Sequence, residues 1–343
     1  MRRSASVIAA LVLVAAGASA QTETLHVDMH AHPSRFHRAA VSAIAPDEVA
    51  RYIEGGMHVA VCNISTDTPF RGGYTERDGT VIPSGQRRAA PGEVWAYTLD
   101  RMDRLDETVA RDDATFVRNP AEARAAAAAG ILGLIPALEG ADALEDDLER
   151  LHELHDRGLG LIQLVHFRAN TLGHIQTWPY SPGGLTEFGR RVVRGANALG
   201  IVIDLAHANS DTIRDTLDVS RHPVIFSHTG ARALQEGDRY LGDDDIEAIA
   251  AADGVIGIWP NGSGLESVAD MARHIAHIRD LVGIEHVGIG SDLRGMGAYS
   301  RGFGEEANFL AIEGALAEHG FDRRAIDLVM GGNFMRVWEA VTR

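Results

Sequence analysis

The stretch IVIDLAHANSDTIRDTLDVSRHPVIFSH, residues 201–228, contains the unit from which the fold can be predicted. The apolar run Ile201–Leu205 is followed by a segment of helical character, Asp211–Val219, and then by a second apolar run, Pro223–Phe226. Both runs are continuous rather than alternating, which is typical of strands buried on both faces of a parallel sheet. The stretch therefore predicts a strand–helix–strand unit in which each strand leads into a histidine.

Apolar runs of the same kind recur along the chain. The eight runs are Leu25–Asp28, Val59–Ile64, Ile131–Leu138, Leu159–Val165, Ile201–Leu205, Pro223–Phe226, Val255–Trp259 and His286–Ile289. Predicted helices between them include Pro120–Ala129, Leu144–Arg157, Thr186–Leu199, Asp211–Val219, Asp243–Ala251 and Val268–Leu281. Eight strand–helix units in about 320 residues predict an α/β protein with a (β/α)8 TIM-like barrel, formed by a single domain over residues 21–343. An open doubly wound sheet is the alternative architecture.

Residues 1–20 have the pattern of a secretory signal peptide. Arg2 and Arg3 precede the short apolar run Ser6–Gly17, and Ala18-Ser19-Ala20 is a small-residue cleavage site. The alternative is an N-terminal membrane anchor, but the apolar run is short for a transmembrane helix. We therefore expect the mature protein to be exported, to the periplasm or beyond, without a stable membrane anchor.

Composition excludes several functional classes. The chain has 32 basic and 48 acidic residues, a formal net charge of −16, and every basic residue is an arginine. A chain without lysine cannot use a lysine Schiff base, a P-loop lysine or a carbamylated lysine that bridges two metal ions. The acidic charge argues against nucleic acid as a partner. Cys62 is the single cysteine, which excludes an intramolecular disulfide and a cysteine-rich zinc site.

Polar residues capable of chemistry follow the apolar runs at the same end. Parallel strands of a barrel present their C-terminal ends at one face, which is where the active sites of this fold are built. Five of the 16 histidines and two acidic residues lie at such positions. They are His30, His32, Glu139, His166, His207, His228 and Asp292.

The histidines and Glu139 predict a binuclear metal site. His30 and His32 are two positions apart, so on a strand both imidazoles face the same way and can bind one ion. His207 and His228 are 21 residues apart, about one strand–helix unit, which places them on adjacent strands. Two nearby cations need an anionic bridge, and Glu139 is the well-placed carboxylate. Neutral imidazole is a good ligand for zinc, so we expect two Zn²⁺ ions per chain.

Two further residues are candidates for catalysis. A water between two metal ions becomes acidic enough to act as a nucleophile, and Asp292 could accept its proton and pass it to a leaving amine. His166 could hydrogen-bond the tetrahedral oxyanion. The alternatives are an acid at a helix N-terminus for Glu139 and a structural role for His166. Two long loops, Thr66–Pro91 and Arg168–Gly184, are expected to overhang the same barrel mouth.

Several segments, in order along nearly the whole mature chain, resemble the membrane (renal) dipeptidase family of zinc peptidases, within the amidohydrolase-like barrel superfamily. They are His30, Glu139-Gly140, Leu161–His166 (LIQLVH), Asp204–His207 (DLAH), Ile225–His228 (IFSH), Val287–Asp292 (VGIGSD) and Met330–Val337 (MGGNFMRV). The resemblance implies a TIM-like barrel with a binuclear zinc site that hydrolyses dipeptides. It assigns His30, His32 and Glu139 to the first metal, and Glu139, His207 and His228 to the second.

The resemblance also implies roles outside the metal ligands. His166 and Asp292 match the oxyanion-binding and proton-transfer positions, and Arg239 matches an arginine that binds the substrate carboxylate. A surface arginine is the alternative for Arg239. The chain departs from the family at His32, where the usual residue is an aspartate, so its first metal would have a less anionic set of ligands. Arg294 replaces a second acid after Asp292 and is a competing carboxylate anchor.

Three functions follow from these observations. The first is a zinc dipeptidase or a close amide hydrolase, with a dipeptide or small amide as substrate; a homodimer is left open. The second is a mononuclear metal deaminase, which also uses an H-x-H pair, two later histidines and an aspartate on the last strand. Glu139 argues against it. The third is a non-hydrolytic binding or maturation protein on a dipeptidase scaffold, of the kind used in siderophore maturation.

Overall fold

The structure is a computed structural model that describes residues 25–38, 41–70, 89–177, 182–304 and 307–343. The predicted signal peptide, residues 1–20, lies outside the described residues, as does most of the predicted loop Thr66–Pro91. Among the helices in the described ranges, none combines the length and apolar character needed to cross a membrane.

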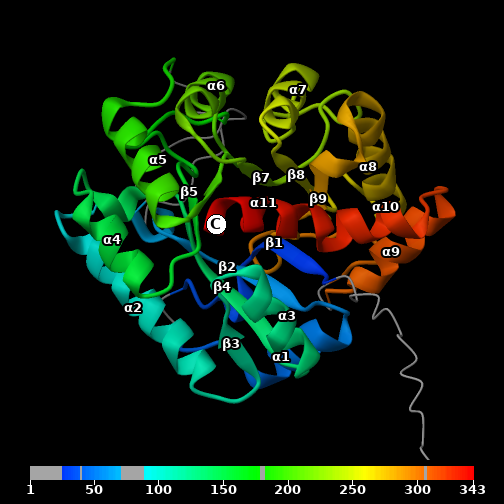
Figure 1. The fold of residues 1–343 in the computed structure, drawn as a ribbon, viewed down its shortest axis with the longest axis horizontal. Coiled ribbons are helices and arrows are strands. Elements are labelled where there is room, and N and C mark those ends of the chain that lie inside the picture. Colours follow the sequence, from blue (N-terminus) through cyan, green and yellow to red (C-terminus); the bar gives the residue numbers. More distant parts are fainter. Residues whose placement is uncertain (1–24, 39–40, 71–88, 178–181, 305–306) are drawn as a thin grey trace, which may run out of the picture.

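Eight parallel strands form the predicted barrel, in the order in which they occur along the chain (Figure 1). They are β1 (Val27–Ala31), β2 (Val59–Ser65), β4 (Leu132–Glu139), β5 (Leu161–Gln163), β6 (Val202–Asp204), β7 (Ile225–Thr229), β8 (Val255–Ile258) and β9 (Val287–Ile289). Each strand overlaps one of the eight apolar runs, so the prediction of a barrel is confirmed.

The chain closes the barrel just beyond β9. Ala31 at the end of β1 forms a parallel bridge with Leu293, and the Asp292 backbone N–H donates to the His30 carbonyl oxygen at 2.8 Å. The buried Asp28 carboxylate adds a side-chain link, because its Oδ1 accepts the Ser291 backbone N–H at 2.7 Å. Contact between the first and last strands rules out the open doubly wound sheet.

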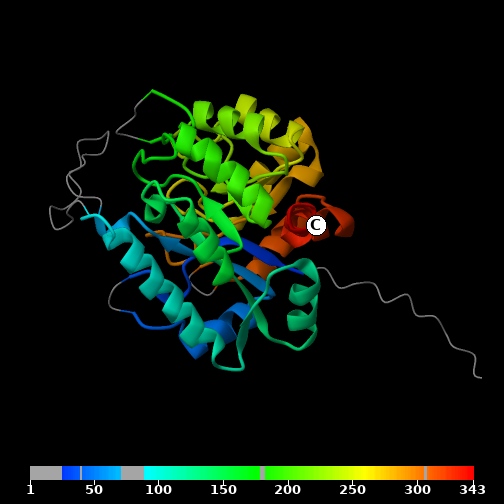
Figure 2. The ribbon, with the colours of Figure 1, turned by 60° about the vertical axis from the view of Figure 1, so that its left-hand side comes forward.

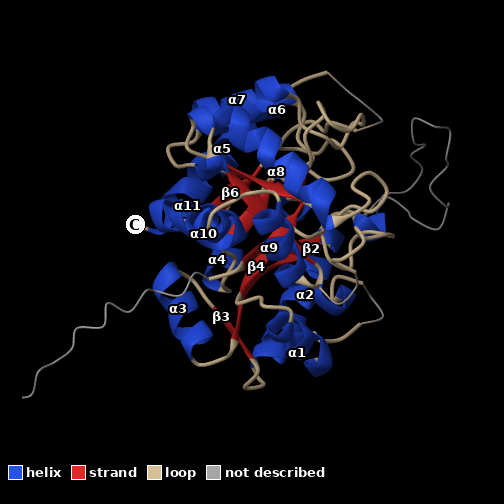
Figure 3. Cartoon of the chain, turned by 90° about the vertical axis from the view of Figure 1, so that its right-hand side faces the viewer, coloured by secondary structure: helices blue, strands red, loops and turns tan. Residues whose placement is uncertain are grey.

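Helices surround the strands, as Figure 3 shows by colour. The α-helices are α1 (Pro46–Glu54), α2 (Glu93–Val109), α3 (Pro120–Ala128), α4 (Glu149–Asp156), α5 (Glu187–Leu199), α6 (Ser210–Val219), α7 (Asp243–Ala251), α8 (Val268–Val282), α9 (Phe309–Glu318), α10 (Arg323–Asp327) and α11 (Asn333–Thr342). Shorter helical turns are η1 (Pro33–Arg35), η2 (Thr68–Phe70), η3 (Asp142–Leu144), η4 (Ile284–His286) and η5 (Leu328–Gly332). At the start of α5 the Thr186 side chain accepts the Gly189 backbone N–H, as an N-cap does.

The structure differs from the prediction in two places. The predicted helix Leu144–Arg157 is divided, because Glu145 and Asp146 adopt left-handed φ angles of 43° and 65° that end η3 before α4 begins. A ninth strand, β3 (Ala114–Phe116), pairs with β4 beside the barrel path. The sequence analysis did not predict it.

The interior of the barrel is closed at the N-terminal ends of the strands. Inward side chains of the strands, such as Val59 and Ile135, form one buried apolar cluster with Phe334 and Trp338 of α11. Figure 1 shows α11 in red across the strands, and Figure 2 shows it at one side of the molecule. Because this end is filled with apolar side chains, polar groups can gather only at the opposite end.

The closing segment resembling the dipeptidase family has a structural role. A Cβ atom on Gly331 would collide with the carbonyl oxygen of Leu25, so glycine allows η5 to pack against the start of the barrel. The Asn333 side-chain amide donates to the carbonyl oxygens of Ile284 at 2.7 Å and Val287 at 2.8 Å. These contacts join α11 to β9 and hold the closing helix in place.

Candidate metal centre

The five predicted metal ligands lie together at the C-terminal ends of the strands. They form two groups that share the Glu139 carboxylate: His30, His32 and Glu139 in one, and Glu139, His207 and His228 in the other. Within each group the ligand atoms lie within 4.8 Å of one another, and all five side chains are buried. The sequence therefore predicted which residues come together; their binding of metal stays a prediction.

The imidazoles direct their Nε2 atoms toward the shared carboxylate. The His30 Nε2 atom lies 3.3 Å from Glu139 Oε1, and the His32 Nε2 atom lies 3.4 Å from Oε2. The two Nε2 atoms of the first group are 3.3 Å apart, and those of His207 and His228 are 3.2 Å apart. Converging imidazole nitrogens around a carboxylate form a donor set suited to a divalent transition metal.

Hydrogen bonds on the far side of the rings set these directions. The His32 Nδ1 atom lies 2.9 Å from the Asn63 carbonyl oxygen, to which it donates. The Ser227 hydroxyl oxygen lies 3.3 Å from His30 Nδ1 and 2.8 Å from His228 Nδ1. The His207 Nδ1 atom is buried and has no hydrogen-bond partner in the described part of the chain. A hydrogen on Nδ1 leaves the Nε2 lone pair free to bind a metal.

The electrostatics keep His207 and His228 uncharged and Glu139 ionised. Burial, together with the nearby Arg239 and neighbouring imidazoles, holds the pKa values of His207 and His228 well below the ordinary histidine value. Burial acts to raise the pKa of Glu139, but the nearby imidazoles of His166 and His32 outweigh it and hold that pKa well below its usual range. Neutral imidazoles and an ionised carboxylate are the forms that bind metal.

Two residues of the site have a left-handed backbone. His207, three residues beyond β6, has φ of 69°, and Asp292, three residues beyond β9, has φ of 47°. This conformation is uncommon for residues other than glycine and often occurs at functional sites. The irregular backbone turns both side chains into the barrel mouth.

Asp292 lies beside the first group. Its Oδ1 atom is 3.5 Å from His32 Nε2 and 4.0 Å from His30 Nε2, and 13% of its side chain is exposed. It is therefore within reach of a group held at the first site and still open to the mouth of the barrel. This placement is compatible with the predicted proton transfer.

His166 lies between two carboxylates, one of which the sequence analysis missed. Its Nε2 atom is 3.1 Å from Glu139 Oε1, and its Nδ1 atom donates to Asp67 Oδ1 at 2.6 Å. The second Asp67 oxygen accepts the Phe167 backbone N–H at 3.1 Å. Asp67 fixes the imidazole ring from a loop 99 residues away in sequence. Asp67 could have been predicted as a site residue from its position two residues beyond the C-terminal end of β2.

Arg239 is not a fully exposed surface arginine. Its Nη1 donates to Gln176 Oε1 at 2.8 Å, and its guanidinium carbon lies 5.1 Å from the centre of the Trp259 ring. Its Nη2 atom is buried, with no hydrogen-bond partner among the described residues. Burial lowers the pKa of Arg239 to about 10, although Asp292 and Glu139 act to raise it. Arg239 therefore carries an unused donor near the metal groups.

Arg294 forms an ion pair with Glu48 rather than with a residue of the two metal groups. Its Nε donates to Glu48 Oε1 at 3.1 Å, and the Glu48 side chain is buried. Glu48 also accepts the Ser34 backbone N–H at 2.9 Å, so the pair joins the segments after β9 and β1. This ion pair favours Arg239 over Arg294 as the carboxylate anchor.

The predicted loop Arg168–Gly184 covers part of the barrel mouth. Ile175 pairs with Ala208, and the Gln176 backbone N–H donates to the His207 carbonyl oxygen at 2.8 Å.

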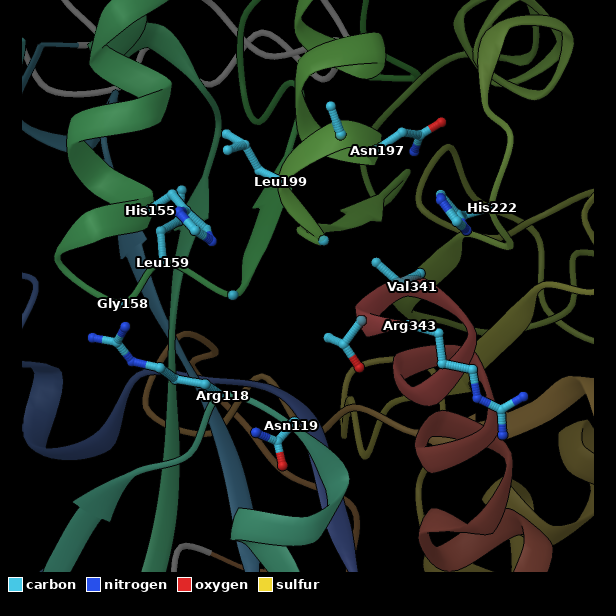
Figure 4. Close-up of a pocket in the computed structure, with 14 residues that line it drawn as sticks. Arg118, Asn119, His155, Gly158, Leu159, Asn197, Leu199, His222, Val341 and Arg343 are labelled. Carbon is cyan, nitrogen blue, oxygen red and sulfur yellow. The ribbon is translucent and has the colours of Figure 1, made fainter.

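A cavity of about 370 Å³ lies at the other end of the barrel, before β5 and β6, and contains none of the predicted site residues (Figure 4).

Comparisons with known proteins identify the family of the chain. A family model described as membrane dipeptidase (peptidase family M19) matches residues 20–343. Dipeptidase 3 of Mus musculus is 29% identical over 220 residues, covering 61% of this chain and 45% of that protein. An uncharacterized dipeptidase of Schizosaccharomyces pombe is 30% identical over 263 residues, covering 73% of this chain and 63% of that protein.

Among solved structures, a metallopeptidase from Rhodobacter sphaeroides superposes with a TM-score of 0.78 and 25% identity. The alignment covers 92% of this chain and 99% of that one, whose structure holds a phosphinate mimic of the dipeptide L-Ala-D-Ala. The chain thus spans about half the length of the first curated relatives it matches and nearly all of this structural relative.

Proposed function

The chain belongs to the membrane dipeptidase family, peptidase family M19, and on this basis we propose that it is a zinc-dependent dipeptidase. The observation that carries the proposal is the pair of three-residue groups sharing Glu139. His30, His32 and Glu139 would hold one Zn²⁺, and Glu139, His207 and His228 the other. Two such ions would supply Lewis-acid activation of a water nucleophile for amide hydrolysis.

The residues around this centre carry the rest of the reaction. Asp292, open to the mouth and 3.5 Å from His32 Nε2, accepts the proton of the attacking water and returns it to the leaving amine. His166, as an imidazolium between the carboxylates of Asp67 and Glu139, donates from Nδ1 to Asp67 and from Nε2 to the oxyanion that develops on the substrate carbonyl. Arg239 uses its Nη2, which has no hydrogen-bond partner among the described residues, to bind the free carboxylate of a dipeptide.

The substrate class is proposed from the same residues and one relative. An arginine donor near a metal centre favours a short substrate whose terminal carboxylate lies close to the scissile amide. The Rhodobacter sphaeroides structure with its L-Ala-D-Ala mimic supports including dipeptides with a D-residue at the C-terminus. His32 adds no negative charge to the first group, so the only negative charge among its three proposed ligands is that of Glu139.

A panel assay tests this function. Purified protein is loaded with Zn²⁺, its metal content is measured, and matched L,L-, L,D- and D-configured dipeptides are offered. We expect about two ions per chain and hydrolysis of at least one class. One ion per chain, unchanged in Glu139→Gln, would favour the mononuclear alternative. Two ions without hydrolysis of any dipeptide would favour a binding or maturation protein.

We also propose that the protein is exported and cleaved after Ala20. The support is the sequence pattern of the first twenty residues. N-terminal sequencing of protein recovered from the periplasm should begin at Gln21. Recovery from the cytoplasm with Met1 still present would contradict export.

A further inference from the structure

Ser227 lies between the two metal groups. It is fully buried on β7, and its hydroxyl is within hydrogen-bond distance of one imidazole from each group. The distances are 3.3 Å to His30 Nδ1 and 2.8 Å to His228 Nδ1. His32 instead uses the Asn63 carbonyl oxygen for its Nδ1. Ser227 is therefore a contact that the two groups have in common besides Glu139.

The backbone of β7 is shaped for this contact. Successive residues of a regular strand point to opposite faces, yet the Ser227 hydroxyl reaches the ring of its neighbour His228. The register between β7 and β8 shifts between Phe226 and Thr229, and such irregularities can redirect a side chain. A Cβ atom on Gly257 or Gly290 would collide with the Ser227 carbonyl oxygen, so the neighbouring backbone allows this close approach.

The hydrogen bonds can be assigned from donor and acceptor chemistry. A neutral imidazole carries one N–H, and an Nε2 atom that binds metal must leave the hydrogen on Nδ1. The Ser227 oxygen has two lone pairs and can accept from both Nδ1–H groups. Asp204 lies beneath it, because its Oδ1 accepts the Ser227 backbone N–H at 2.9 Å.

We propose that Ser227 is a positioning residue shared by both metal sites. Its hydroxyl accepts from His30 and His228 together and fixes each ring in the tautomer that presents Nε2 to metal. The inference rests on the metal centre of the proposed function, but not on the substrate. It follows that loss of the Ser227 hydroxyl weakens metal binding at both sites, although Ser227 is not a ligand of either ion.

Metal titration tests this coupling directly. The full chain is stripped with a chelator, and Zn²⁺ is added in competition with a chromophoric chelator to wild type, Ser227→Ala and Ser227→Thr. Loss of such an outer contact commonly weakens metal binding by about 10–100-fold. We expect a loss of that size at both sites in Ser227→Ala and partial recovery in Ser227→Thr, which restores the hydroxyl. Ser300→Ala, a buried serine bonded to the Leu265 carbonyl, is the matched control and should bind like wild type.

A second measurement reports the tautomers themselves. In metal-free wild type labelled with ¹⁵N-histidine, the neutral His228 ring should carry its hydrogen on Nδ1, and Ser227→Ala should show mixed tautomers. If Ser227→Ala does not fold, a neutral His228 ring with its hydrogen on Nε2 in wild type overturns the inference.

The titration separates this inference from the proposed function. Wild type that binds fewer than two ions contradicts the binuclear centre. Wild type that binds two ions, with Ser227→Ala losing affinity at one site or at neither, overturns the role of Ser227 alone.

Discussion

Replacement of Arg239 by alanine should remove the preference for a free carboxylate. The Arg239 Nη1 is bound to Gln176 at 2.8 Å, while Nη2 has no partner among the described residues. One charged hydrogen bond to the substrate is therefore at stake, which contributes about 1.5–3 kcal/mol. At about 1.4 kcal/mol per factor of ten, kcat/KM for a dipeptide acid should fall about 10–150-fold.

A matched dipeptide acid and its amide provide the assay. Wild type should cleave the acid more efficiently by a factor of the same size, and Arg239→Ala should lose this ratio by slowing the acid, not by accelerating the amide. Arg232→Ala, which removes an exposed charge from the same loop, is the matched control and should keep the ratio. Equal cleavage of acid and amide by wild type would refute carboxylate recognition by Arg239. A ratio lost in Arg294→Ala instead would reassign the anchor.

Three further outcomes are expected. Asp292→Asn should keep its metal but lose turnover by about 10²–10⁴-fold, since general acid–base catalysis is removed; kcat near that of wild type, measured at matched metal content, would exclude Asp292 from proton transfer. Asp67→Asn should lower kcat with little change in metal content, because Asp67 Oδ1 accepts from His166 Nδ1 at 2.6 Å and His166 is not one of the proposed metal ligands; an unchanged kcat would make the contact purely structural. Burial lowers the pKa of His274 to about 4, and its Nδ1 accepts the Ala231 backbone N–H. As pH falls from about 6.5 to 4, the unfolded state therefore binds a proton at His274 that the folded state does not, and the free energy of unfolding should decline. Unfolding measured over this pH range should show a steeper decline in wild type than in His274→Gln, and parallel curves would contradict the prediction.

The barrel could be predicted because its strands are buried on both faces. A continuous apolar run followed by a polar residue marks the C-terminal end of such a strand, so the same pattern located the eight strands of the barrel and the side chains at their ends. The three-residue strand β3 gave no comparable signal, since Ala114–Phe116 is too short to show a pattern and pairs outside the barrel.

The contacts that complete the site depend on tertiary structure. Asp67 reaches His166 across 99 residues, and Glu48 reaches Arg294 across 246, so neither pair has a local sequence pattern. Ser227 stands beside a predicted ligand in the sequence, but its contact with His30 spans 197 residues. Sequence reasoning therefore found the residues that project from strand ends and missed those that orient them.

An anomalous difference map would show whether one carboxylate joins two metal sites. Crystals of the Zn²⁺-loaded protein would be measured at energies above and below the zinc absorption edge. We expect two peaks, one contacted by His30, His32 and Glu139, and the other by Glu139, His207 and His228. A single peak, or two peaks of which only one contacts Glu139, would refute the shared carboxylate.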